Sequence, residues 1–180
     1  HLKSSLGQLS FVSNVSLAGP YSTPTSVIGF DIFTVDDGHH EAWKAIDYIR
    51  VDDDYFDLFN ITLIQGTTFD QSDASFGRYD KVVVNEALVK AMAWENPLEE
   101  FISNYEITGV VEDFNFYGLQ REAAPMIFRS NSDFPEKLLI KFRQATKKDI
   151  EAVKDIWARN IKSHSISYRV LDDYFEQQLE

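Results

Sequence analysis

Two adjacent histidines and their acidic neighbours are the residues of this chain whose types best suit a transition metal. His39 and His40 follow Asp36 and Asp37 and precede Glu41. Imidazole and carboxylate groups both bind zinc and nickel. Adjacent residues on a turn seldom direct their side chains at one ion, so we expect this segment to be a solvated hairpin tip. We therefore predict no metal site.

Two clusters of aspartates carry the oxygen ligands that calcium prefers. Asp52, Asp53 and Asp54 form the first cluster, and Asp70 with Asp73 forms the second. An EF-hand loop alternates its ligands, carries a central glycine and ends on a distant glutamate, and neither cluster has this pattern. We expect the first cluster to begin a short helix, where carboxylates offset the helix dipole and cap free N–H groups.

The neighbouring carboxylates Glu112 and Asp113 have the residue types of a glycosidase acid/base pair. Such a pair must face one cleft at a separation of roughly 5–9 Å, whereas neighbours in a strand point to opposite faces. We expect Asp113 and Asn115 to make structural hydrogen bonds after the strand instead. No Gly-x-Ser-x-Gly, Walker A or Gly-x-Gly-x-x-Gly motif occurs. We predict no catalytic site, no nucleotide site and no cofactor.

Composition indicates a folded domain and argues against nucleic acid and anionic lipid as partners. The chain has 180 residues, of which 44% are hydrophobic and 14% aromatic, and it has no cysteine, so thiolate chemistry is excluded. Its length allows one domain or two small subdomains. The net charge of −12 repels nucleic acid and anionic lipid surfaces, so we expect neither as a partner. No apolar run approaches the ~20 residues of a membrane span.

The middle of the chain predicts a strand followed by a helix. Residues 82–84 are three valines, which are β-branched and favour a buried strand. Asn85 has the side chain of an N-cap, and Glu86 follows at the positive end of the helix dipole. The helix is expected to extend to Asn96 and Pro97, because the residue before a proline is pushed out of the α region.

A second apolar run, over residues 107–111, predicts another strand. It contains Gly109, which has no side chain to pack and marks a bulge or a close backbone approach. Aromatic residues follow this strand. Phe114, Phe116 and Tyr117 fit an exposed patch that contacts a partner, and they fit a core equally well.

The two ends of the chain predict further sheet structure. Residues 27–35 and 43–51 are predicted to pair as a hairpin. Residues 137–143 form an apolar run typical of a strand, and residues 146–161 carry one apolar stripe at helical spacing. Residues 165–170 alternate apolar and polar, which predicts a strand and completes a β-α-β unit.

These motifs together resemble a known family. The pattern V-V-V-N-E-A, a helix, W-E-N-P and then I-T-G-V-V-x-D-F-N is similar to the extracytoplasmic core domain of MacB-like and FtsX-like ABC transporter permeases, in the versions common in Bacteroidota. A second pattern, V-D-x-D-Y-F-x-x-F-x-I-x-L-I-x-G-x-x-F from Val51 to Phe69, resembles the same family. The chain departs from the family where Ala93 replaces the usual glycine before tryptophan and where Glu99-Glu100 replaces Gly-Lys. The motif positions are filled by Asn85, Glu86, Trp94, Asn96, Pro97, Gly109, Asp113, Asn115 and Pro125.

The resemblance implies an α+β fold in two parts. Residues 1–65 and 131–180 would form a porter-like β-α-β subdomain from both ends of the chain, and residues 66–130 would form an inserted mixed α/β subdomain. It also implies a domain without enzymatic activity, at the periplasmic face of the bacterial inner membrane. That domain would transmit ATP-driven motion of transmembrane helices to a periplasmic substrate or partner protein.

The same resemblance implies the domain's partners. They are the flanking transmembrane helices, a second permease in a homodimer, and an ATPase domain or subunit that alone binds ATP. Two alternatives remain open on the residues alone. A soluble or lipid-anchored ligand-binding module would show a large apolar cavity with a few convergent polar groups. A hydrolase would show a cleft with two carboxylates of strongly perturbed pKa.

Overall fold

The computed structural model describes residues 2–24, 29–36, 41–69, 80–114, 122–130, 136–161 and 166–172. Its helical elements are α1 (Leu2–Gly7), α2 (Asp54–Phe59), α3 (Glu86–Met92), α4 (Lys147–Asn160) and the 3-10 turn η2 (Pro97–Glu99). Its strands are β1 (Val12–Ala18), β2 (Gly29–Asp36), β3 (Glu41–Val51), β4 (Leu63–Gly66), β5 (Asp80–Asn85), β6 (Phe101–Ile102), β7 (Tyr105–Val111), β8 (Met126–Ser130) and β9 (Lys137–Phe142).

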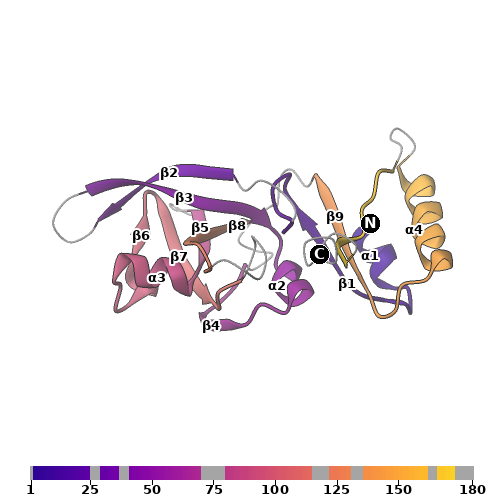
Figure 1. The fold of residues 1–180 in the computed structure, drawn as a ribbon, viewed down its shortest axis with the longest axis horizontal. Helices are drawn as coiled ribbons and strands as arrows, with labels where there is room; N and C mark the ends of the chain where they lie inside the picture. The colour runs from indigo at the N-terminus through magenta and orange to yellow at the C-terminus, as the bar shows by residue number, and fades with distance from the viewer. Residues whose placement is uncertain are drawn as a thin grey trace.

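Six strands pair in a closed ring, which we call the barrel (Figure 1). Strand β2 pairs with β3 and β6, β6 with β7, β7 with β5, β5 with β8, and β8 with β3. The β3–β8 and β5–β7 pairs are parallel and the other pairs are antiparallel. Each ring strand contributes to one apolar cluster, which also includes Leu88 of α3; its ring members are Phe33, Ile46, Val82, Val84, Ile102, Ile107, Val110 and Ile127.

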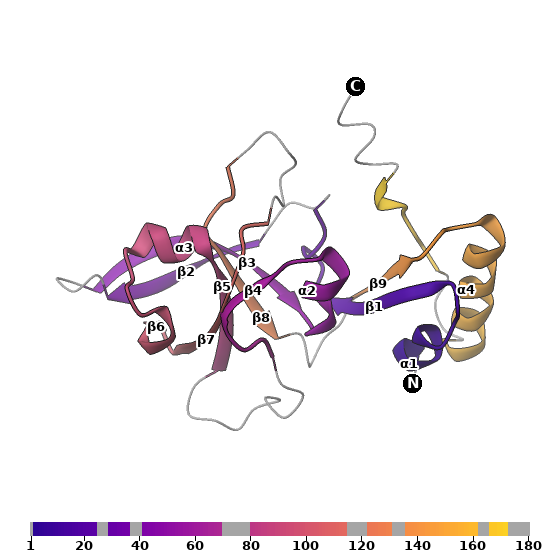
Figure 2. The same ribbon diagram turned by 90° about the horizontal axis from the view of Figure 1, so that it is seen from below.

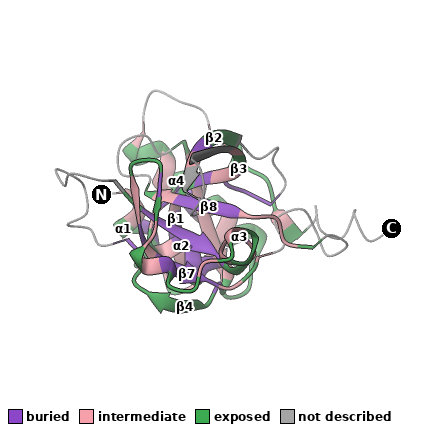
Figure 3. Cartoon of the chain, turned by 90° about the vertical axis from the view of Figure 1, so that its left-hand side faces the viewer, coloured by how far each residue is buried: buried purple, intermediate pink, exposed green. Residues whose placement is uncertain are grey.

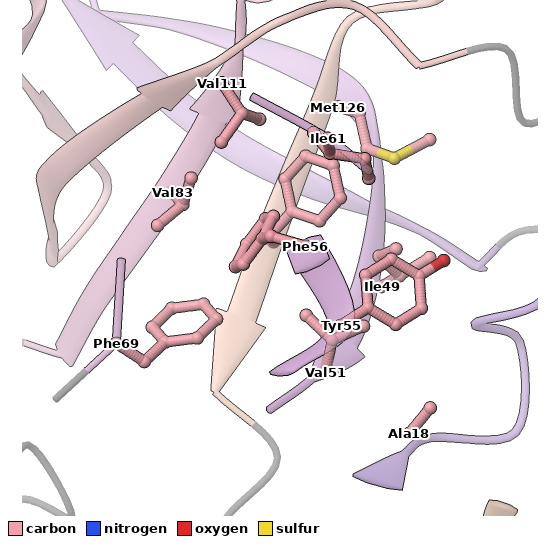
Figure 4. Packing of buried hydrophobic residues seen from close by; sticks show 11 residues of the cluster. Ala18, Ile49, Val51, Tyr55, Phe56, Ile61, Phe69, Val83, Val111 and Met126 are labelled. Carbon is pink, nitrogen blue, oxygen red and sulfur yellow. The ribbon is translucent and has the colours of Figure 1, made fainter. Parts of the chain in front are cut away.

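A second apolar cluster lies on the other face of the ring strands, beneath α2. Tyr55 and Phe56 point from α2 into this cluster (Figure 4). The three valines of β5 divide between the two clusters, because Val82 and Val84 face one way and Val83 the other. All three are fully buried, which confirms the predicted buried strand. Figure 3 shows the same pattern, with buried residues along β7 and β8 and exposed residues along β4.

Strands β1 and β9 continue the sheet beyond the barrel as an antiparallel pair, with α1 and α4 against them (Figures 1 and 2). Leu6, Val12, Val15 and Val153 form the centre of a third apolar cluster there. We call α1, β1, β9 and α4 the end lobe, and the barrel with α2, α3 and β4 the barrel lobe. Strand β1 reaches the barrel sheet where Ala18 pairs with Val51.

Several predicted elements are confirmed. Strands β2 and β3 form the expected hairpin, although its tip, with His39 and His40, lies outside the described residues. Strand β9 and helix α4 lie where the sequence predicted them. Helix α4 begins with a reciprocal capping box, in which the side chains of Thr146 and Asp149 each accept the other's backbone N–H.

Helix α3 ends earlier than predicted. Its last residue is Met92, and Ala93 adopts a left-handed conformation with φ 53°. The N–H of Ala93 donates to the carbonyl of Lys90, which closes the helix. Pro97 starts the short turn η2 instead of stopping the helix. The prediction was wrong because it considered the proline and not the left-handed residue before Trp94.

The predicted strand at residues 165–170 is also wrong over its described part. Residues 166–170 have no strand pairing, so the β-α-β unit is incomplete in this structure. Tyr168 is 54% exposed, and its ring centroid lies 4.8 Å from Nζ of Lys154 on α4. A segment with alternating apolar and polar residues forms a strand only where the edge of a sheet is free to pair with it. This segment instead packs its tyrosine on helix α4.

The described elements form a mixed α+β fold, and the predicted division at residues 65 and 66 stays a prediction. The pairings show that β2 and β3, from the first predicted subdomain, share the barrel with strands of the second. Among the described residues, no helix has the length and apolar character needed to cross a membrane.

Candidate functional site

Asn85 joins three segments of the barrel lobe. Its side-chain oxygen accepts the N–H of Leu88 at 3.1 Å, which confirms the predicted N-cap of α3. The same oxygen accepts the N–H of Met126 at 2.9 Å. The side-chain nitrogen donates to the carbonyl of Ala124 at 2.9 Å. Asn85 is 2% exposed, so these bonds satisfy a buried amide and fix α3 against the start of β8.

The adjacent carboxylates after β7 make separate structural bonds. Asp113 accepts the N–H of Ala87 at 2.8 Å, in the first turn of α3. Glu112 accepts the N–H of Thr62 at 3.0 Å, and its own N–H donates to the carbonyl of Thr62. They therefore hold two different segments rather than facing one cleft. The structural role of Asp113 is confirmed, and Asn115 lies outside the described residues.

Gly109 lies where two backbones approach closely. The register of β5 with β7 slips by one residue at Thr108, which is a bulge. A Cβ at Gly109 would lie 2.3 Å from the carbonyl oxygen of Thr67. Its partner on β4, Gly66, has φ +78°, and a Cβ there would lie 2.2 Å from the oxygen of Thr108. Both features predicted for Gly109 are confirmed.

The other residues of the motif lie at the two ends of α3, in η2 and just before β8. Trp94 is half-buried against the apolar cluster inside the barrel, and Pro97 is buried at the start of η2. Asn96 and Glu86 are exposed, and Pro125 is half-buried before β8.

The candidate partner-contact residues are only partly described. The ring of Phe114 packs on Phe59, with centroids 5.3 Å apart, and it is half-buried. Phe116 and Tyr117 lie outside the described residues. A role of these aromatic residues in partner contact stays a prediction.

The connection between the two lobes is organised by Asp52, which lies between β3 and α2. One carboxylate oxygen accepts the hydroxyl of Ser16 at 2.7 Å. The other accepts the N–H of Leu17 at 2.8 Å and the ammonium of Lys3 at 2.6 Å. The N–H of Asp52 also donates to the carbonyl of Leu17. We call Asp52 and these three partners the lobe junction.

Lys3 of α1 also contacts Asp54, so two carboxylates share one ammonium. Burial lowers the pKa of Lys3, but hydrogen bonds to Asp52 and Asp54 and their negative charges raise it above its usual value. The N-cap residue of α2 is Asp53, whose side chain makes no capping bond. The predicted capping is therefore wrong, because the flanking carboxylates bind distant groups. The predicted dipole effect is compatible with Asp54 and Asp57, which lie in the first turn.

A second set of bonds lies beside the lobe junction. The fully buried Tyr55 donates its hydroxyl to the carbonyl of Ser22 at 3.0 Å. Burial raises the pKa of this hydroxyl strongly. The carbonyl of Arg50 accepts both the N–H of Gly19 and the hydroxyl of Ser22, each at 2.8 Å. The loop after β1 is thereby attached to the end of β3.

Sequence reasoning did not single out Lys3 or Ser16, because their partners are distant in the chain. The signal that could have found this region was the second pattern of family resemblance. Three of its residues, Asp52, Asp54 and Tyr55, lie at or beside the lobe junction. No group of three or more metal-ligating side chains is present in the described ranges.

This fold occurs in solved structures of known proteins. The periplasmic region of MacB from Actinobacillus actinomycetemcomitans superposes with a TM-score of 0.65, over 99% of this chain and 80% of that one, at 15% sequence identity. This is the fold of the MacB periplasmic region.

Two further solved structures share the fold. The extracellular domain of the ABC-type transporter YknZ from Gram-positive bacteria gives a TM-score of 0.56 at 14% identity, over 89% of this chain and 80% of that chain. A permease-protein domain from Porphyromonas gingivalis gives a TM-score of 0.60 at 10% sequence identity, over 93% of this chain and 84% of that chain. No protein-family model matches the sequence, and no curated protein matches it significantly.

Proposed function

We propose that the chain is the non-catalytic extracytoplasmic domain of an ABC transporter permease. The observation that carries this proposal is the MacB-like fold, which extends over 99% of the chain. We infer a location at the periplasmic face of the inner membrane. Flanking transmembrane helices would belong to a permease homodimer, and ATP would bind only to a separate ATPase domain or subunit. Because fold does not determine function by itself, an experiment must test the assignment.

In this proposal the end lobe receives the motion of the membrane helices. Helix α1 contacts α4, and the last described segment contacts α4 through Tyr168. Both end segments therefore lie on one lobe, which supports entry of the motion there. A displacement of α1 would reach the barrel lobe through Lys3 and Asp52 and the β1–β3 contact. The barrel lobe would then move as a rigid body against a periplasmic substrate or partner protein.

The experiment interrupts the C-terminal attachment of this domain to the membrane helix in the full-length transporter. A short Gly-Ser linker is inserted between Val170 and Leu171, after the segment in which Tyr168 contacts Lys154 of α4. We expect transport to be lost while ATP hydrolysis continues, because a flexible linker does not pass on a displacement. The matched control places the same linker between Gln144 and Ala145, in the exposed turn before α4. That variant should transport normally.

Transport that survives the first insertion would contradict the transmission role. Loss of transport in both variants would indicate damage to the end lobe instead. Thermal unfolding of both variants separates these cases, since only a misfolded end lobe lowers the melting temperature.

A further inference from the structure

Two arginines lie opposite one another at the end of the parallel β3–β8 pair. Arg50 of β3 and Arg129 of β8 are direct partners in the register. Paired residues of neighbouring strands face the same side of a sheet, and the strands lie only about 4.8 Å apart. Like charges placed directly opposite one another are destabilising. This pair therefore needs a compensating interaction.

Arg129 is held by aromatic rings. Its guanidinium carbon lies 4.6 Å from the ring centroid of Tyr105 and 5.7 Å from that of Tyr48. Phe33 packs edge-on against both tyrosine rings and supports them from within the barrel. Stacking uses the faces of a planar guanidinium and leaves its N–H donors free at the edge.

Within the described residues, neither guanidinium has a hydrogen-bond acceptor or an ion-pair partner. Arg50 is exposed and Arg129 is half-buried. This is unusual for a chain that has 29 acidic residues and 17 basic ones. Asp52 follows Arg50 closely in sequence, but its oxygens bind Ser16, Leu17 and Lys3.

We propose that Arg50 and Arg129 together bind a phosphate group. A phosphate monoester carries a charge of about −1.5 to −2 at neutral pH, which matches two guanidinium groups better than a single carboxylate does. Arginine forks form paired, charge-assisted hydrogen bonds with phosphate oxygens. Bound phosphate would also remove the repulsion between the arginines. This proposal does not depend on the transporter assignment.

The test is a titration of the 180-residue chain with inorganic phosphate and with glycerol 3-phosphate at constant ionic strength. Binding is followed by the NMR signals of the arginine Nε–H groups. We expect saturable shifts for Arg50 and Arg129, and about ten-fold weaker binding in either Arg50→Gln or Arg129→Gln. Arg129→Lys keeps the charge but loses the fork, so its binding should be intermediate. Arg143→Gln, an exposed arginine of the end lobe, is the matched control and should bind as the parent chain does.

Two results would overturn the proposal. The first is linear shifts without saturation, and the second is an affinity in Arg50→Gln or Arg129→Gln equal to that of the parent chain. A second arm distinguishes the source of the phosphate. Vesicles of neutral lipid with phosphatidic acid would be bound if the ligand is a lipid headgroup. We expect no vesicle binding with a net charge of −12, and hence a soluble phosphate ester.

Discussion

The ammonium nitrogen of Lys3 lies 2.6 Å from a carboxylate oxygen of Asp52, although the two residues are 49 positions apart in sequence. The same carboxylate accepts the hydroxyl of Ser16 and the N–H of Leu17. One side chain therefore joins α1, β1 and the segment that leads into α2.

Replacing Asp52 with alanine should lower the free energy of unfolding by about 2–4 kcal/mol. The substitution leaves the fully buried Ser16 hydroxyl and the Leu17 N–H without their acceptor. Asp52→Asn keeps an acceptor oxygen and should cost less. Urea unfolding measures both. Asp53→Ala is the matched control, because that exposed side chain makes no capping bond, and its effect should stay within about 0.5 kcal/mol. Equal effects at the two positions would mean that the lobe junction adds no stability.

Ala93→Gly should stabilise the chain by about 0.5–1 kcal/mol. Ala93 has φ 53°, a conformation in which a Cβ is strained and glycine is not. Ala91→Gly, in the helical part of α3, should instead destabilise by about 0.5–1 kcal/mol, since glycine there only adds unfolded-state entropy. Chemical denaturation of the two variants gives the comparison. Shifts of the same sign would contradict the assigned end of α3.

Gly109→Ala should destabilise by roughly 3 kcal/mol or more. The new Cβ would lie 2.3 Å from the backbone oxygen of Thr67, so β4 or β7 must move. Gly7→Ala is the control, because no atom lies within 4 Å of its Cβ position. Melting temperatures suffice to separate the two. A Gly109→Ala variant as stable as Gly7→Ala would show that β4 and β7 are not in close contact.

Tyr55 should make the chain less stable in alkali. Burial raises the pKa of its hydroxyl, so the folded chain keeps a proton that the unfolded chain loses near pH 10. The protonated hydroxyl makes its full contribution to the free energy of unfolding below about pH 10. Above that pH the contribution falls by about 1.4 kcal/mol per pH unit. The raised pKa of Lys3 acts in the same direction above about pH 10.5.

The variant Tyr55→Phe tests this pH dependence. It lacks the ionisable hydroxyl, and it also loses the bond to the Ser22 carbonyl, which should cost about 1 kcal/mol at neutral pH. Its free energy of unfolding should fall less steeply between about pH 10 and pH 11 than that of the parent chain. Parallel pH profiles would place the hydroxyl in water rather than in the core.

Sequence reasoning predicted the features that depend on neighbouring residues. The N-cap role of Asn85 follows from its place between a strand and a helix, and its partner Leu88 is three residues away. The burial of residues 82–84 follows from their side chains. Gly109 was predicted to lie at a bulge or a close approach, because glycine within a strand has few other reasons to occur.

The predictions failed where distant groups compete with local ones. Asp52 was expected to cap a helix, but Lys3, Ser16 and Leu17 bind its oxygens. The alternation of residues 166–170 predicts a strand without identifying an edge to pair with. Strand β6 has two residues, too few to show any period. The facing pair Arg50 and Arg129 depends on the β3–β8 register, which no local pattern encodes.

Closure of the barrel has a consequence for how the chain folds as it is made. Strand β8 lies between β3 and β5, yet it follows both in the chain. A nascent chain that ends before residue 126 would expose the edges of β3 and β5, which are sites for mispairing with other chains. The pairings of β8 with β3 and β5 close the barrel, and they join residues that are far apart in sequence. Such long-range contacts form slowly. The barrel should therefore close only after β8 has been made, and folding should be sensitive to truncation before β8.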